Sequence, residues 1–383
     1  MRIVLLTDFL YPRYGGISTH VEGLVKALIR EGHKAIVITT AGDKRGFDKL
    51  DDMITVYRDP APVLTTLIFN IERLKKRIES VIREIDPDIL HAHHAFSPMG
   101  IITPEIGKKL GIPTVLTNHS VPFGFYVARY QWYTIAKLLA TFSALRSLRM
   151  YDRVIAVSPV AAEFISKFYR GKIHIIPNAI HLDEFDKIEA SKEELGLNKD
   201  EPLILMVGRA SLKKGFELAL LAFKKVVDEV PNARLFIVGL TGFLRSYING
   251  LVKFLKLEEN VYIPGYVPRE ILIKFYKAAD VFIHAAYGGE SFGIVLIEAM
   301  AAGTPIVSTA GDGLKHVLEN SGAAICLDVP NPSTLARAIL KLLNDEDMRR
   351  SMSIAGRKYV KKYSWSRIIK RIIEIYTQLV ENS

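Results

Sequence analysis

The sequence predicts an α/β protein with two doubly wound parallel sheets, one after the other along the chain. Its 383 residues exceed the roughly 250–300 at which a single hydrophobic core stops growing, so two domains are expected. Short β-branched runs alternate with longer segments of helical spacing, as in repeated βαβ units. This alternation pauses between residues 178 and 202, which places the linker there.

The first half contains six short apolar runs that predict strands, with helical patterns such as 19–31 and 104–110 between them. The runs are Ile3–Thr7, Ala35–Thr39, Ile89–Ala92, Pro113–Thr117, Arg153–Val157 and Lys172–Ile176. Because βαβ units make their strands parallel, we assign residues 1–180 to one domain with a doubly wound sheet.

The second half repeats this pattern, with helical spacing over 217–230 and 332–344. Its predicted strands are Leu203–Val207, Arg234–Val238, Val261–Ile263, Val281–His284, Pro305–Ser308 and Ala324–Leu327. Residues 181–364 therefore form the second predicted domain. The last segment, 365–383, predicts an amphipathic helix that could pack on either domain. Its apolar stripe consists of Ile368, Ile369, Ile372, Ile373 and Tyr376.

The composition is that of an ordinary globular protein, with 49% hydrophobic and 24% charged residues. The single cysteine, Cys326, excludes a disulfide framework and suits a reducing compartment. The first residues predict a strand rather than a signal peptide, and no run of about 20 apolar residues predicts a membrane helix. We expect a cytoplasmic protein that is soluble or peripherally attached to the inner face of the cell membrane.

The net charge of +10 is concentrated in the first half. Residues 1–180 hold 24 Lys and Arg against 16 Asp and Glu, whereas residues 181–383 hold 27 against 25. The first half therefore faces an anionic partner or carries a solvated basic face. Nucleic acid is not the expected partner, because the chain contains no helix-turn-helix, zinc-finger or RNP signature.

Two loops that follow predicted strands have the composition of phosphate sites. Gly15 and Gly16 precede a helix, where backbone amides and the helix dipole favour an anion, although a glycine pair also makes a plain tight turn. Arg209 and Lys214 lie in the loop after the first strand of the second half. Their cations suit a diphosphate leaving group through charge-assisted hydrogen bonds, and a solvated basic loop is the alternative.

The most specific signal is a pair of glutamates, Glu290 and Glu298, on either side of seven residues. Between them, the run Ser291-Phe292-Gly293-Ile294 predicts a helix start whose free amides could face a phosphate. A carboxylate accepts several hydrogen bonds, so Glu298 could hold the vicinal hydroxyls of a ribose and Glu290 those of a sugar. A helix-capping glutamate beside an unrelated one is the structural alternative.

With these motifs the chain resembles glycosyltransferase family 4, whose members have the retaining GT-B fold of two Rossmann-like domains facing across a cleft. The resemblance extends over nearly the whole length and includes Ser18 and His20 after the Gly-Gly loop. It implies that Arg209 and Lys214 bind the donor diphosphate. It also implies that Glu298 binds the ribose and Glu290 the transferred sugar.

The same resemblance implies three further roles. The backbone around Gly265, Tyr266 and Val267 would contact the base, the Gly16 amide would meet the distal phosphate, and the last helix would cross back to the first domain. The donor would be a UDP- or GDP-sugar, bound as a substrate with no cofactor. Retention would follow front-face attack, in which the leaving phosphate takes the acceptor's proton.

Segments 90–97 and 117–125 resemble a narrower group, the N-acetylglucosaminyl-phosphatidylinositol synthase catalytic subunits and the phosphatidylinositol mannosyltransferases. The family places a histidine near the donor sugar at the position of His119. We therefore expect His119 to be catalytic, by donating a hydrogen bond to the sugar or the phosphate.

Two other patterns could suggest metal ligands. His91 and His93 share one face of a predicted strand, beside His94. Since no third ligand is evident, we favour packing or cleft lining for these histidines. Asp86 and Asp88 form an Asp-x-Asp pattern, but they precede a strand and so lie opposite the expected cleft. We expect the transfer to be metal-independent.

A stretch of unusual charge indicates the acceptor. Residues 106–151 contain no Asp or Glu, and they combine many aromatic residues with Lys108, Lys109, Arg129, Lys137, Arg146 and Arg149. Membrane-surface segments combine basic and interfacial aromatic side chains in this way. We therefore expect residues 121–150 to contact the membrane. A helical insert that packs on its own domain or on a dimer partner is the alternative.

The sequence thus predicts a retaining transferase that moves a hexose or N-acetylglucosamine to an acceptor, which we expect to be an inositol phospholipid. One alternative is a soluble family 4 enzyme that acts on a small sugar or a sugar phosphate. Another is a nucleotide-sugar epimerase of the same fold. The base, the sugar and the oligomeric state stay open.

Overall fold

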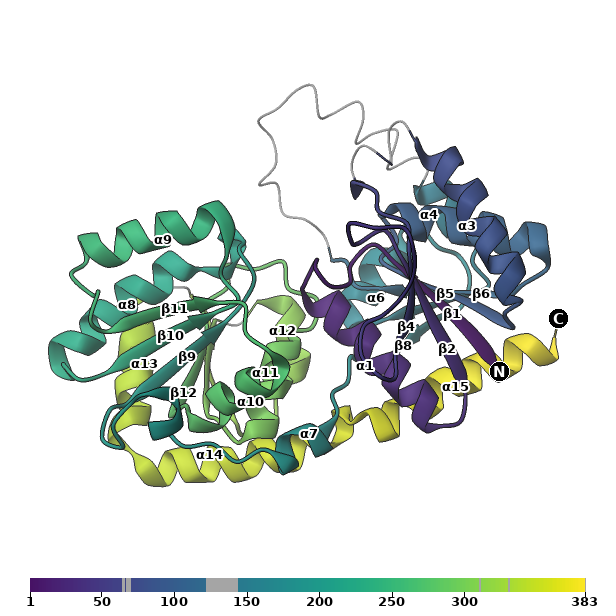
Figure 1. Cartoon of the computed structure of the whole chain (residues 1–383). Helices are drawn as coiled ribbons and strands as arrows, with labels where there is room; N and C mark the ends of the chain where they lie inside the picture. The colour runs from purple at the N-terminus through teal and green to yellow at the C-terminus, as the bar shows by residue number, and fades with distance from the viewer. Residues whose placement is uncertain (64–65, 67–69, 122–143, 310, 330, 383) are drawn as a thin grey trace. The chain divides into compact units, whose positions relative to one another are not determined.

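The computed structural model describes residues 1–63, 66, 70–121, 144–309, 311–329 and 331–382. It divides the chain into two compact units (Figure 1). Unit 1 is Met1–Ala179 together with Trp365–Ser383, and unit 2 is Ile180–Ser364. Most of the predicted membrane segment 121–150 lies outside the described residues, and among those described no helix is long and apolar enough to cross a membrane.

Unit 1 contains an eight-stranded sheet in the order β3-β4-β2-β1-β5-β6-β7-β8. Its strands are β1 (Arg2–Thr7), β2 (Lys34–Thr39), β3 (Gly46–Lys49), β4 (Thr55–Arg58), β5 (Ile89–His93), β6 (Thr114–Asn118), β7 (Arg153–Ala156) and β8 (Ile173–Ile175). Only β3 and β4 pair antiparallel. The strand order changes direction between β1 and β5, so their carboxyl ends form the topological switch point where doubly wound sheets bind ligands.

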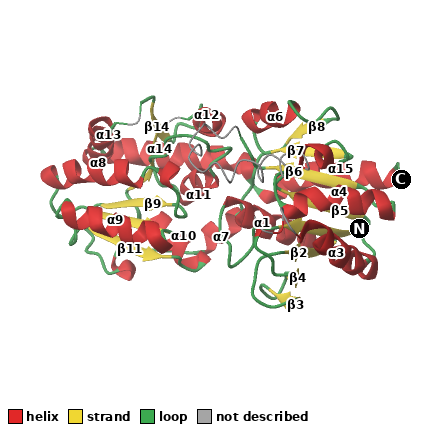
Figure 2. Ribbon diagram, turned by 90° about the horizontal axis from the view of Figure 1, so that it is seen from above, coloured by secondary structure: helices red, strands yellow, loops and turns green. Residues whose placement is uncertain are grey.

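Helices cover both faces of this sheet (Figure 2), because alternate residues of each strand point to opposite sides. Ile3 and Leu5 pack with α1 and α15, whereas Val4 and Leu6 pack with α3, α4 and α6. The helices are α1 (Gly16–Arg30), α3 (Ile71–Ile85), α4 (Pro98–Leu110), α6 (Pro159–Ser166) and α15 (Trp365–Glu381). The sheet therefore has a hydrophobic core on each side.

The last helix, α15, packs against α1 through a close approach at a glycine (Figure 1). A β-carbon on Gly23 would lie 2.3 Å from the indole Nε1 of Trp365. Farther along α15, Ile368 and Tyr376 are buried in the core that contains β1. Arg371 donates a 2.8 Å hydrogen bond to the backbone oxygen of Ile175. The end of the chain is thus part of the core of unit 1.

Unit 2 contains a six-stranded parallel sheet in the order β11-β10-β9-β12-β13-β14. Its strands are β9 (Leu203–Val207), β10 (Arg234–Val238), β11 (Val261–Gly265), β12 (Val281–His284), β13 (Ile306–Thr309) and β14 (Ala324–Leu327). The order changes direction between β9 and β12, which makes their carboxyl ends the switch point of this sheet.

One face of the second sheet packs on α8, α9 and α13 around Phe216, Phe223 and Ile339. On the other side, α10 contacts β9 and α11 contacts β13. The helices are α7 (Leu182–Lys187), α8 (Phe216–Glu229), α9 (Gly242–Phe254), α10 (Arg269–Ala278), α11 (Ile294–Ala302), α12 (Asp312–Leu318), α13 (Pro332–Asn344) and α14 (Glu346–Tyr359), with short 3₁₀ turns at Glu193–Leu195, Leu212–Lys214 and Val360–Tyr363.

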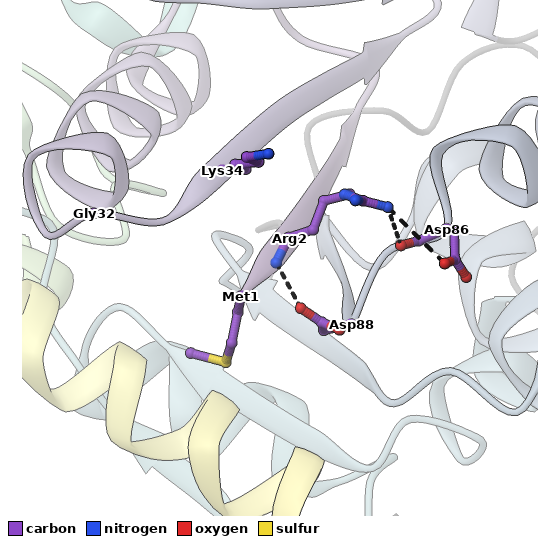
Figure 3. Close-up of a pocket in the computed structure, with 6 residues that line it drawn as sticks. All are labelled: Met1, Arg2, Gly32, Lys34, Asp86 and Asp88. Carbon is purple, nitrogen blue, oxygen red and sulfur yellow. Dashed lines mark hydrogen bonds and ion pairs between the residues drawn. The ribbon is translucent and has the colours of Figure 1, made fainter.

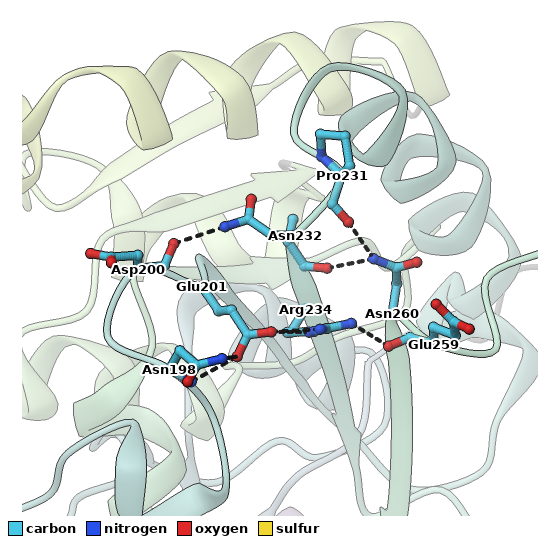
Figure 4. Close-up of polar contacts among 9 residues, drawn as sticks. Asn198, Asp200, Glu201, Pro231, Asn232, Arg234, Glu259 and Asn260 are labelled. Carbon is cyan, nitrogen blue, oxygen red and sulfur yellow. Dashed lines mark hydrogen bonds and ion pairs between the residues drawn. The ribbon is translucent and has the colours of Figure 1, made fainter.

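The amino ends of β9, β10 and β11 are tied together by polar contacts (Figure 4). Glu201 accepts a 2.8 Å hydrogen bond from Nε of Arg234 and a 2.7 Å bond from the backbone of Asn198. Arg234 also donates to the backbone oxygen of Glu259. Asn260 donates two 2.9 Å bonds to the chain that enters β10. These bonds hold the edge of the sheet opposite the switch point.

Candidate active site

At the switch point of unit 2, a lysine and a glutamate from two different loops form an ion pair. Lys214 lies in the loop after β9 and Glu290 in the loop after β12. The Nζ of Lys214 is 3.0 Å from Oε1 of Glu290, and both side chains are largely buried. Lys213 approaches the same oxygen at 3.6 Å and donates a 2.8 Å bond to the backbone of Gly289. The structure therefore joins two of the predicted site residues directly.

The close approach of these two loops depends on glycine. Gly215, which follows Lys214, has φ of +70°, and a β-carbon there would lie 1.9 Å from the backbone oxygen of Ala285. Gly313, in α12, passes equally close to the backbone oxygen of Glu290, at 1.6 Å from a built β-carbon. A larger residue at either position would push the Lys214 and Glu290 loops out of place.

The electrostatics of the pair favour an ionised carboxylate. Burial by itself raises the pKa of Glu290, but the charges of Lys214 and Lys213 and the hydrogen bond from Lys214 outweigh burial and lower it overall. His284, the last residue of β12, is buried, and burial lowers its pKa to about 4. Glu290 is thus an anion beside a neutral imidazole. His284 was not singled out from the sequence, although a polar residue ending a buried strand was the available signal.

The other predicted residues of the diphosphate site surround this pair. Arg209 is exposed, and within the described part of the chain it makes no ion pair, so its guanidinium is available to an anion. Helix α11 begins after Gly293, which has φ of +75° and provides no side-chain cap. The first residues of this helix, Ile294 and Val295, come directly after the loop of Glu290 and Ser291, and the dipole at a helix start favours negative charge.

The side chain of Phe292 is not part of a ligand surface. It is 1% exposed, and its ring packs 5.5 Å from the rings of His316 and Tyr363. Any contribution of Phe292 to ligand binding therefore comes from its backbone, with the buried ring holding the loop in place.

Glu298, on α11, is held by two side chains of α10. Arg269 donates to one carboxylate oxygen, and the hydroxyl of Tyr276 donates a 3.0 Å bond to the other. Arg269 also reaches Glu184 at 3.1 Å, so its cation is shared by two carboxylates. A carboxylate has about four acceptor positions, so Glu298 keeps capacity for a ribose hydroxyl. That role stays a prediction, and Arg269 is a partner that was not foreseen from the sequence.

The predicted base-binding segment follows β11. Gly265 is buried with φ of +81°, Tyr266 is 49% exposed and Val267 is partly exposed. The amide of Gly239, after β10, donates a 2.7 Å bond to the oxygen of Gly265. Glycines thus lie at the carboxyl ends of two neighbouring strands. Because they have no side chain, a ligand can approach the backbone there.

In unit 1 the predicted Gly15-Gly16 loop lies at the corresponding switch point, after β1. Gly15 precedes α1, and its backbone exchanges hydrogen bonds with the hydroxyl of Ser18, at 2.8 and 2.7 Å. Within the described part of the chain, no side chain caps the first amides of α1, which start at Gly16. This arrangement suits an anion at the helix start.

His119 lies just after β6 and meets two other histidines. Its Nε2 is 3.5 Å from Nδ1 of His93, and its ring stands edge-on to that of His20 at 4.9 Å. Burial, helped by repulsion from nearby histidines, holds the pKa of His119 and His93 well below the usual range, and burial lowers that of His20 to about 3. All three are neutral at physiological pH. The third histidine is His20, from α1, which the sequence analysis named only as part of the family resemblance; the expectation that no third histidine joins this group was wrong.

His91 belongs to the supporting layer of this cluster. Its Nδ1 lies 2.5 Å from the hydroxyl of Tyr376 on α15, and its Nε2 lies 2.7 Å from the hydroxyl of Thr117. Its ring stacks on His93 at 4.4 Å. His94 follows with φ of +77°, a conformation that costs energy outside glycine. The expectation of packing therefore suits His91, which has both nitrogens in hydrogen bonds.

The Asp-x-Asp pattern lies at the opposite edge of the sheet, at the amino ends of β1 and β5 (Figure 3). The backbone of Arg2 donates a 2.6 Å bond to the carboxylate of Asp88, and its guanidinium donates a 2.8 Å bond to the backbone oxygen of Asp86. The pattern is thus a loop that fixes the start of β1.

Family models match both halves of the chain. Residues 14–184 match Glycosyltransferase Family 4, and residues 187–359 match Glycosyl transferases group 1. An uncharacterized glycosyltransferase of Methanocaldococcus jannaschii is 31% identical, over 100% of this chain and 99% of that protein.

Two further relatives have names that include a lipid. A phosphatidylinositol N-acetylglucosaminyltransferase subunit of Saccharomyces cerevisiae is 29% identical, over 100% of this chain and 84% of its own. An alpha-monoglucosyldiacylglycerol synthase of Acholeplasma laidlawii is 24% identical, over 100% and 98%.

Solved structures show the same fold. Sucrose-phosphate synthase from Thermosynechococcus elongatus superposes with a TM-score of 0.83 at 23% identity, over 100% of both chains. Anabaena HepE in complex with UDP-glucose superposes with a TM-score of 0.76 at 18% identity, over 99% of this chain and 100% of that one. The chain therefore belongs to glycosyltransferase family 4 and has the GT-B fold of two parallel-sheet α/β domains.

Proposed function

We propose that this glycosyltransferase takes a hexose or N-acetylglucosamine from a UDP- or GDP-sugar with retention of configuration and without a metal at the donor. The observation that carries the proposal is the Lys214–Glu290 pair at the switch point of unit 2. A lysine there can stabilise the departing diphosphate as its negative charge develops. The carboxylate can meanwhile accept hydrogen bonds from the hydroxyls of the transferred sugar.

When the donor binds, its diphosphate would replace Glu290 as the ion-pair partner of Lys214. Glu290 pairs with Lys214 and also approaches Lys213, so one carboxylate faces two cations and one positive charge is left for the diphosphate. Arg209 and the start of α11 add positive potential on the same side of the sheet. Phosphate oxygens would then pair with the lysine ammonium groups, and Glu290 would accept hydrogen bonds from the sugar hydroxyls. No protein carboxylate is assigned as a nucleophile, which suits front-face attack with the leaving phosphate as the base.

The acceptor we propose is an inositol phospholipid at the membrane surface. The support is the likeness to a phosphatidylinositol N-acetylglucosaminyltransferase subunit and to an alpha-monoglucosyldiacylglycerol synthase, together with the acid-free stretch 106–151. Within the described end of that stretch, Arg146 and Arg149 are exposed while Ala144 and Leu148 are buried. The basic side chains can thus face anionic lipid headgroups.

The transfer is tested with UDP-N-acetylglucosamine, UDP-glucose and GDP-mannose, each incubated with phosphatidylinositol in mixed micelles. We expect one donor to give a glycolipid whose anomeric proton shows the donor's configuration by NMR, at a rate unchanged by EDTA. An inverted product or a rate lost with EDTA would refute the retaining, metal-independent proposal. Transfer to soluble sugars alone would refute the lipid acceptor, and an epimerised donor formed without acceptor would indicate an epimerase.

Membrane contact is tested separately by co-sedimentation with vesicles that contain phosphatidylinositol. We expect the double variant Arg146→Ala and Arg149→Ala to bind about 30-fold more weakly, because each basic residue near an anionic surface contributes about 1 kcal/mol. The control is Arg73→Ala with Lys76→Ala, which removes two exposed cations from α3. Equal loss in both variants would show only a general charge effect.

A further inference from the structure

Three histidines from separate segments converge at the switch point of unit 1. His20 comes from the second turn of α1, His93 ends β5, and His119 follows β6. One ring nitrogen from each lies within 4.8 Å of the others. Their rings are in mutual contact, with centroids 4.9, 5.4 and 5.8 Å apart. The fold therefore gathers three imidazoles at the edge where a doubly wound sheet binds ligands.

The nitrogens of this cluster lack the partners that buried polar atoms ordinarily have. His20 is 2% exposed and His93 is fully buried. Among the described residues, neither nitrogen of His20 makes a hydrogen bond of ordinary geometry, although the side chain of Asn178 lies close to it, and Nε2 of His93 has no partner. A buried polar atom without a partner is costly, and native structures contain few of them. The lone pairs of these nitrogens are therefore available to a ligand that accepts electron pairs.

We propose that His20, His93 and His119 bind one divalent transition metal of the zinc type, with the fourth position open to solvent. Tetrahedral zinc with Zn–N bonds of 2.0–2.1 Å needs nitrogens about 3.3 Å apart. The His93 and His119 nitrogens are already 3.5 Å apart. Because the ligand nitrogens lie within 4.8 Å of one another, a side-chain adjustment of up to about 1.5 Å would bring His20 into range. His119 is the partly exposed member, so the open position faces its side.

The donor set selects the class of metal. Three neutral imidazoles without a carboxylate suit Zn²⁺, Co²⁺, Ni²⁺ or Cu²⁺, whereas Mg²⁺ and Ca²⁺ prefer oxygen ligands. The surrounding side chains also restrict ring movement. His91, anchored to Tyr376 and Thr117, stacks on His93, and Trp365 packs against His20 with ring centroids 5.3 Å apart. Such support around the ligands orients them for a metal.

The alternative is that water molecules, and not a metal, bind these nitrogens, and that the neutral histidines serve only in packing. The proposal is independent of donor chemistry in unit 2, since all three ligands belong to unit 1. Metal-binding measurements therefore test this proposal, whatever the transfer assays show.

The test is equilibrium dialysis of the chelator-stripped full chain against Zn²⁺, and against Co²⁺ with absorption spectroscopy. We expect one tight equivalent of Zn²⁺, displaceable by Co²⁺ with the visible bands of a four-coordinate nitrogen site, and no competition from excess Mg²⁺. His20→Gln and His119→Gln should each weaken binding by at least the roughly 10–100-fold that loss of an outer-shell partner causes.

The matched control is His174→Gln, which removes a histidine of unit 1 from β8, away from the cluster. This variant should keep the affinity and the Co²⁺ spectrum of the unmodified chain. The partly exposed His119 makes its variant the safer one for folding, which circular dichroism verifies. Zn²⁺ binding that is absent, or that is equal in His119→Gln and the unmodified chain, would overturn the proposal.

Discussion

The ammonium of Lys214 and the carboxylate of Glu290 lie 3.0 Å apart, on loops that follow two different strands of one sheet. The two strands, β9 and β12, are neighbours where the strand order reverses. A cation and an anion are therefore placed side by side at the one edge of unit 2 where a nucleotide sugar is expected.

Replacing Lys214 by Met should lower kcat by about 10²-fold, because removal of one donor from a developing anion has an effect of that order. The measurement is steady-state transfer with whichever of UDP-N-acetylglucosamine, UDP-glucose and GDP-mannose the enzyme uses. Lys224→Met is the control, since Lys224 pairs with Asp228 on the outer face of α8. A Lys214→Met enzyme as fast as this control would remove Lys214 from the mechanism.

Replacing Arg269 by Met should destabilise unit 2 by about 3 kcal/mol, because the buried carboxylate of Glu298 loses its counter-ion. Urea unfolding monitored by fluorescence measures the change. In the Arg269→Met background, adding Glu298→Gln should restore part of the stability, since a neutral amide needs no cation. If the second change instead destabilises further, the pair is not held by charge.

Replacing Gly23 by Ala should destabilise unit 1 by about 2 kcal/mol, because the new β-carbon would collide with Trp365. Limited proteolysis should also release α15 more readily. In Gly250→Ala, where nothing lies within 4 Å, the same change on an exposed helix should stabilise by up to about 1 kcal/mol. Adding Trp365→Leu to Gly23→Ala should recover stability, and failure to do so would locate the strain elsewhere.

Acid should destabilise unit 2 partly through His284, whose pKa of about 4 in the folded chain lies below the usual 6.5. Between those two values the unfolded chain takes up a proton that the folded chain does not, so stability falls as pH decreases from 6.5 toward 4. From pH 7.5 to 5.5 this contribution is about 1.4 kcal/mol.

The measurement is the free energy of unfolding in urea at both pH values. His284→Gln should lose about 1.4 kcal/mol less than the unmodified chain between them, and identical losses would mean that His284 does not stay neutral. The contributions of the other buried histidines cancel in this comparison, because those histidines titrate in both proteins.

Strands and helices with strong apolar patterns were predictable from the sequence. Residues 203–207, 281–284 and 332–344 were assigned with the bounds that the structure shows for β9, β12 and α13. The strands β3 and β4 were missed. Residues Gly46–Lys49 of β3 are polar and partly or fully exposed at the sheet edge, and Thr55–Arg58 of β4 is a run of only four residues. An edge strand gains its conformation from its neighbour, which leaves little periodicity in its own residues.

The sequence by itself determined the α/β class, the family and the chemical type of the site residues, because periodicity and spaced motifs are local properties of the chain. Tertiary structure decided which of those residues meet. Glu290 pairs with Lys214, Glu298 pairs with Arg269, and His20 joins His93 and His119. Such contacts depend on strand order and on close glycine passages between loops, and both arise only when distant segments pack into one sheet.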